Sequence, residues 1–86
     1  GAHVPGEPMP GVASFEQMQA LQSATGVEAE RIFLELMIAH HQGGVDMAEA
    51  VIARSSQPQV TGLAEGMVQL QSKELAYMSE LLAARS

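Results

Sequence analysis

Apolar residues recur with helical spacing through most of the chain, and they predict three helices. Ser14 followed three positions later by Gln17 is a capping-box pattern, which indicates that a short helix begins there and covers residues 15–23. Apolar positions then recur at intervals of three and four over residues 26–54 and again over residues 58–84. The alternation typical of strands is absent, so the pattern predicts an all-α fold.

The two long helices are predicted to form an antiparallel hairpin. Ser55, Ser56 and Gln57 precede Pro58, and such a cluster ends one helix while proline favours the first turn of the next. A connection this short forces the helices to lie side by side in opposite directions. Residues 1–13 contain three prolines and three glycines and are predicted to be an extended arm, so residues 14–86 form the helical domain.

A hairpin alone leaves half of each apolar stripe uncovered, and the short helix can shield only part of it. We therefore expect a half-bundle that is completed to four long helices. Either a homodimer or a second hairpin of a longer chain would supply the missing pair.

Composition narrows the classes of function. A chain of 86 residues forms one domain at most, and the absence of cysteine excludes disulfides, thiolate metal sites and a cysteine nucleophile. The formal net charge of −6 disfavours nucleic acid as a partner. No apolar run reaches the ~20 residues of a membrane span.

Four polar residues interrupt the apolar stripes of the predicted hairpin. At 100° per residue, His40 falls in the middle of the stripe on the first long helix, and His41 falls on its shoulder. Gln71 and Glu74 fall within the stripe of the second. Folding about Ser56 places His40 opposite residue 72 or so. We therefore expect one polar layer in which a buried Glu74 is paired either with His40 or with a cation.

Two interpretations of this layer remain open. In one, His40 and Glu74 form a buried packing pair in a non-catalytic structural or interaction domain. In the other, the layer belongs to a metal site, because the chain has six methionines and imidazole and thioether groups together are soft ligands suited to Cu(I). The candidate metal ligands are Met37, His40, His41, Met47, Glu74 and Met78. Met67 and Gln71 are second choices.

Catalytic constellations are missing. A di-iron site needs Glu-x-x-His on two helices, and a zinc hydrolase of the helical type needs His-Glu-x-x-His; neither occurs. A ferritin-like iron oxidoreductase is therefore the weaker alternative, and we expect no enzyme. Gly43-Gly44 inside a helix indicates either close approach of another helix backbone or space for a ligand beside His40.

Residues 33–52 resemble a ferritin-like family known as domain of unknown function 305 (DUF305). The family pattern is Met-Ile-x-His-His-x-Gly-Ala followed by Met-Ala. It is matched by Met37-Ile38, His40-His41, Gly43 and Met47-Ala48, with Gly44 where alanine is usual. The resemblance extends to Met9-Pro10-Gly11 and to Gln71, Glu74 and Met78.

The resemblance implies a bacterial helical bundle outside the cytoplasm, periplasmic or secreted, often built from two such hairpins in one chain. It also implies copper as a possible bound metal, because some members bind copper through Met and His and take part in copper resistance. The single hairpin of this sequence resembles the carboxyl-terminal one.

Overall fold

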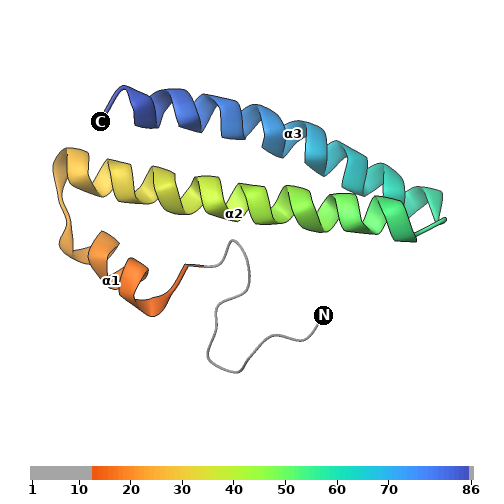
Figure 1. The fold of residues 1–86 in the computed structure, drawn as a ribbon, viewed down its shortest axis with the longest axis horizontal. Helices are drawn as coiled ribbons and strands as arrows, with labels where there is room; N and C mark the ends of the chain where they lie inside the picture. Colours follow the sequence, from red (N-terminus) through yellow and green to blue (C-terminus); the bar gives the residue numbers. More distant parts are fainter. Residues whose placement is uncertain (1–12, 86) are drawn as a thin grey trace.

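Three helices make up the part of the chain that the structure describes. The computed structural model describes residues 13–85, with α1 at Phe15–Ser23, α2 at Gly26–Arg54 and α3 at Pro58–Ala83 (Figure 1). Within these residues there is no strand, and the predicted all-α fold is confirmed. The third helix ends one residue before its expected end. The predicted arm lies outside the described residues, except for Ala13.

The two helix starts at Ser14 and Thr25 differ in their capping. The backbone amide of Ser14 donates to Gln17 Oε1 at 2.8 Å, and the amide of Gln17 donates to Ser14 Oγ at 3.1 Å, which completes the capping box. Thr25 makes no such bond, although the sequence shows the same pattern with Glu28. The reason is Gly26, whose φ of +59° lies in the left-handed region rather than in the helical one that a capping box requires.

The hairpin of α2 and α3 is closed at both ends. At the turn, Ser55 Oγ accepts a hydrogen bond of 3.1 Å from the amide of Gln57, and Pro58 begins α3. At the opposite end, Arg85 Nε donates to Glu30 Oε1 at 2.8 Å, which joins the end of α3 to the beginning of α2. The two long helices therefore lie antiparallel along their whole length (Figure 1).

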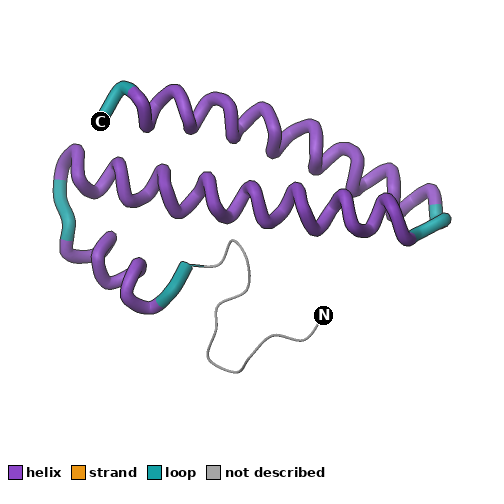
Figure 2. The backbone as a smooth tube through the Cα atoms, viewed as in Figure 1, coloured by secondary structure: helices purple, strands orange, loops and turns teal. Residues whose placement is uncertain are grey.

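The helices form a single layer. Figure 2 shows α1 folded back beside α2, on the side away from α3, so that the three helices lie side by side. The molecule measures 46 Å along its longest axis and 15 Å along its shortest. A layer this thin exposes both of its broad faces.

The core lies along the contact between α2 and α3, which we call the seam. Its buried residues are Leu34, Val45, Ala48, Ala64 and Met78. Each retains between 5% and 9% of its surface accessible, and none of the described side chains is fully buried. The seam therefore encloses very little apolar volume for a domain of this length.

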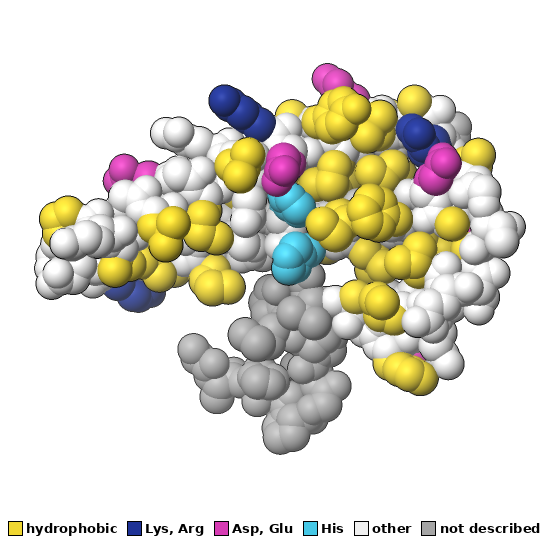
Figure 3. Space-filling model, turned by 180° about the vertical axis from the view of Figure 1, so that it is seen from behind, with side chains coloured by type: hydrophobic (Ala, Val, Ile, Leu, Met, Phe, Trp, Pro, Cys, Tyr) yellow, Lys and Arg dark blue, Asp and Glu magenta, His cyan; other side chains and the backbone are white. Residues whose placement is uncertain are grey.

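A second apolar surface runs beside the seam on one broad face, which we call the open face. A hollow in it is lined by Gly44, Met47, Ala48, Val51, Val60, Leu63, Ala64 and Met67. Figure 3 views this side of the molecule and shows apolar side chains to both sides of the two described histidines. The apolar stripe expected of each long helix is thus divided between the seam and the open face.

Candidate metal centre

The two adjacent histidines of α2 point in different directions. A helix turns 100° per residue, so His41 is directed into the seam, where its side chain is 12% exposed, while His40 is exposed beside it. Their rings meet edge to face, with centroids 6.0 Å apart. Helical spacing predicted that His40 lies in the middle of the apolar stripe, whereas the structure directs His41 into the seam and leaves His40 exposed.

Glu74 pairs with His41 and not with His40. Its Oε1 lies 2.7 Å from His41 Nε2, and its side chain is 48% exposed, so the predicted buried pair of His40 and Glu74 is wrong in both partner and burial. The cause is the register of the hairpin. Folding about Ser56 would set residue 71 opposite His41, whereas α3 is displaced by three residues, close to one helical turn.

Both nitrogens of the His41 ring face oxygen acceptors. Nδ1 lies 2.9 Å from the carbonyl oxygen of Met37, which can only accept a hydrogen bond, and Nε2 faces the Glu74 carboxyl. A ring nitrogen that carries a hydrogen donates it to the oxygen that it faces, and the contact with Glu74 is an ion pair when the ring is protonated and the carboxyl ionised. This arrangement satisfies His41 without any ligand.

His40 lines a hollow between α1 and α2 together with two methionines. The lining residues are Ala13, Met18, Leu21, Phe33, Leu36, Met37 and His40. Two thioethers and one imidazole therefore border the same space, and no carboxylate does. Thioether and imidazole ligands favour Cu(I) over hard cations such as Mg²⁺.

Met18 was not among the ligands predicted from the sequence. It is separated from Met37 by the turn between α1 and α2, so helical spacing alone could not connect them. The capping box at Ser14 was the available signal, because it sets the start of α1 and hence the side of the helix on which Met18 lies.

The remaining predicted ligands lie elsewhere. Met47 is 64% exposed and lines the hollow of the open face with Met67, which is 40% exposed. Met78 is buried in the seam. The structure thus distributes the six candidates over four places: Met37 with His40, His41 with Glu74, and Met47 and Met78 each on its own.

Gln71, a second-choice ligand, lies against Gly44. A Cβ atom at Gly44 would overlap Gln71 Oε1 and lie 3.1 Å from its Cδ. This oxygen is buried and has no hydrogen-bond partner. The glycine therefore makes room for a side chain of α3, whereas the sequence left open a helix backbone or a ligand.

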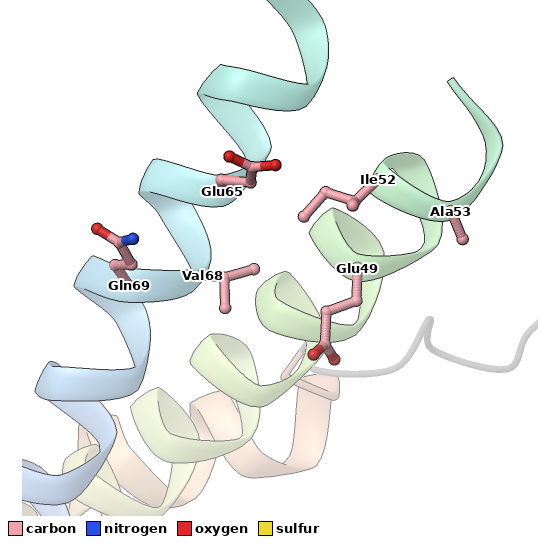
Figure 4. Close-up of a pocket in the computed structure, with 6 residues that line it drawn as sticks. All are labelled: Glu49, Ile52, Ala53, Glu65, Val68 and Gln69. Atoms are coloured by element: carbon pink, nitrogen blue, oxygen red, sulfur yellow. The ribbon is translucent and has the colours of Figure 1, made fainter. Parts of the chain in front are cut away.

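Other groupings of chemical interest are sparse. Within residues 13–85, no three His, Cys, Asp or Glu side chains gather where they could hold a metal ion together. A hollow on the opposite broad face is lined by Glu49, Ile52, Ala53, Glu65, Val68 and Gln69. Figure 4 shows its two carboxylates at different edges, with Ile52 and Val68 between the helices. No helix of the described part is long and apolar enough to cross a membrane.

Comparison with known proteins points to one family. The model of the family "Domain of unknown function (DUF305)" matches residues 1–82. A crystal structure of a DUF305 protein from Streptomyces coelicolor, provisionally described as secreted, is 39% identical with a TM-score of 0.82. The match covers 95% of this chain and 54% of that one, so this chain spans about half the length of its relative. No curated protein matches the chain.

Proposed function

Because the chain belongs to the DUF305 family, whose name assigns no activity, we propose its function from its own side chains: a non-catalytic helical module that binds copper as Cu(I). One observation carries the proposal. Met18, Met37 and His40 come from two helices and border one hollow. Cu(I) favours such thioether and imidazole donors and needs few of them.

His41 and Glu74 are the next candidates, because the His41 ring lies 6.0 Å from that of His40, centroid to centroid, and its Nε2 meets the Glu74 carboxyl. A metal ion at His41 Nε2 would take the place of the proton that now lies between that nitrogen and Glu74 Oε1, which are 2.7 Å apart. Binding there would release a proton and break the hydrogen bond to Glu74. Met47 and Met78 are the least supported of the six, since neither lies at this hollow.

A copper module outside the cytoplasm agrees with the description of the Streptomyces coelicolor relative as secreted. Copper would be its cargo, held for tolerance or transfer. We place this chain in the same compartment on that basis.

The test is titration with Cu(I) under a competing chelator, in the absence of oxygen. Met18→Leu, Met37→Leu and His40→Gln remove the donor atoms while keeping side-chain volume close to the original. We expect each to weaken Cu(I) binding at least tenfold with helical circular dichroism unchanged. Met47→Leu is the matched control and should bind like the parent chain. A folded chain that takes up no Cu(I), or three variants that bind like the control, would refute the proposal.

A second function is favoured by the ion pair of His41 and Glu74. Since both ring nitrogens are satisfied by the protein itself, the pair also suits a structural or interaction domain in which it specifies helix register. His41→Gln separates the two functions. Lower stability with full Cu(I) uptake would assign His41 to structure alone, and lost uptake would add it to the metal ligands.

A further inference from the structure

We propose that the open face binds a second copy of this chain. Two hairpin layers would then stack face to face as a four-helix bundle, related by a two-fold axis that passes through the polar layer of His40, His41, Gln71 and Glu74. The inference concerns association and does not rest on metal binding.

The thinness of the molecule is the first argument. A stable domain packs at least two layers of secondary structure around its core. This chain has one layer, 15 Å thick along the shortest axis, and no described side chain that is fully buried. A second layer would enclose the open face and convert it into the centre of a core.

The size of the exposed apolar surface is the second argument. Large apolar side chains there expose from 40% to 69% of their surface. Met47, Val60, Leu63 and Met67 line the hollow, and Leu70 and Tyr77 follow Leu63 at intervals of seven residues, on the same side of α3. Together they leave roughly 600 Å² exposed, close to the ~800 Å² per partner of a standard interface. The largest apolar patch of a typical monomer is about 300–600 Å² and often functional, so this surface lies at the upper end of that range.

The chemistry of the face suits a copy of the same chain as the occupant. The net charge is −6, yet none of the eight residues that line the hollow of the open face is charged. Apolar side chains lie to both sides of the histidines (Figure 3). A copy turned by 180° about an axis through the polar layer therefore places its apolar side chains against those of the first copy. It also places the two polar layers against each other, as a two-fold interface requires.

The length of the relative agrees with an occupant of this size. The present chain covers 54% of the Streptomyces coelicolor chain, so the rest of that chain is long enough for a second unit of similar length. Two copies of this chain together are about as long as the single chain of the relative.

Light scattering on the intact chain tests the proposal. We expect twice the chain mass and a Tm that rises with protein concentration. Leu63→Glu puts a charge on the open face and should give the single-chain mass. Ser72→Glu is the matched control, because it adds the same charge nine residues later, half a turn around the same helix, and should leave the dimer intact.

A second measurement covers the case in which Leu63→Glu prevents folding. The chain contains no cysteine, so Met67→Cys on the open face and Ser72→Cys on the other side each introduce a single thiol. We expect a maleimide to react at least tenfold more slowly with the thiol at position 67. A folded parent chain of single mass, a dimer that survives Leu63→Glu, or equal reactivity of the two thiols would each overturn the proposal.

Discussion

His40 and His41 are neighbours in sequence and opposites in environment. His41 is 12% exposed, and its two ring nitrogens face the Met37 carbonyl and the Glu74 carboxyl. His40 is exposed, borders a hollow with two thioethers, and finds no hydrogen-bond partner for its ring within residues 13–85. One histidine connects two helices, and the other is the histidine for which we propose a ligand.

The same contrast extends along the whole of α2. One strip, with Leu34, Val45 and Ala48, is buried in the seam, and the strip beside it, with Phe33 and Met47, is about half or more exposed. Side chains one residue apart diverge by 100°, so adjacent residues fall on different strips. The seam carries the stability of the monomer, and the neighbouring strip carries the surfaces for which we propose partners.

The largest expected effect lies in the seam. Leu34 is 5% exposed, so Leu34→Ala leaves a cavity in the seam. This substitution should lower the free energy of unfolding by about 2–4 kcal/mol. Val27→Ala, at a residue of the same helix that is 56% exposed, should change it by less than about 0.5 kcal/mol. Urea unfolding at one protein concentration measures both. Equal losses would mean that the seam is not the core.

Replacement of the two histidines compares the strips directly. His41→Ala removes two hydrogen bonds of a half-buried ring and should cost about 1–2 kcal/mol of unfolding free energy. His40→Ala should cost less than about 0.5 kcal/mol at protein concentrations at which the chain is a monomer, because its ring is exposed in the single chain. Urea unfolding of the metal-free protein measures both costs. A greater loss of unfolding free energy for His40→Ala would show that His40, and not His41, is the ring that stabilises the helix contact.

Two glycines sharpen the comparison at smaller scale. Alanine in a helix interior is favoured over glycine by about 1 kcal/mol. A Cβ atom added at Gly62 would have no other atom within 4 Å, so Gly62→Ala should raise the free energy of unfolding by about 1 kcal/mol. Gly44→Ala should gain less than half as much, because Gln71 must move. Thermal unfolding measures both variants, and Gly44→Ala should recover the full gain in a Gln71→Ala background. Equal gains in the parent chain would show that Gln71 does not restrict this site.

The smallest effect concerns the ion pair itself. A double-mutant cycle of His41→Ala and Glu74→Ala should give a coupling energy of about 0.2–1 kcal/mol, since Glu74 is 48% exposed and the pair is partly screened. The coupling should decrease with added salt. The same cycle with His40→Ala should give none, and a coupling of equal size there would contradict the observed pairing.

The predicted pairing of His40 with Glu74 was wrong, and the metal site stays a prediction. Helical periodicity placed His40, His41, Gln71 and Glu74 near one level, and the structure brings His41 to Glu74 and Gln71 to Gly44. The error came from the turn, where a displacement of three residues along α3 exchanged one histidine for the other. Periodicity cannot supply that displacement, because it depends on how the turn residues and Ala48 and Ala64 let the helices approach.

Met18 illustrates a different limit. It shares an apolar stripe with Phe15 and Leu21, which lie three residues to either side of it. The residues that it meets on α2 could not be predicted, since the direction of α1 depends on Gly26 and its left-handed backbone. A ligand set drawn from two helices therefore becomes visible only when the connection between them is known.

The sequence by itself determined the all-helical class, the order of the three helices, the family and the surplus of apolar surface. These follow from local spacing, capping residues and short motifs, which act within a few residues along the chain. Only the tertiary structure decided which histidine enters the seam, which methionines share a hollow and which face stays open. Those outcomes depend on the rotation and register of one helix against another, and a shift of a single turn there exchanges the partners of every side chain in the layer.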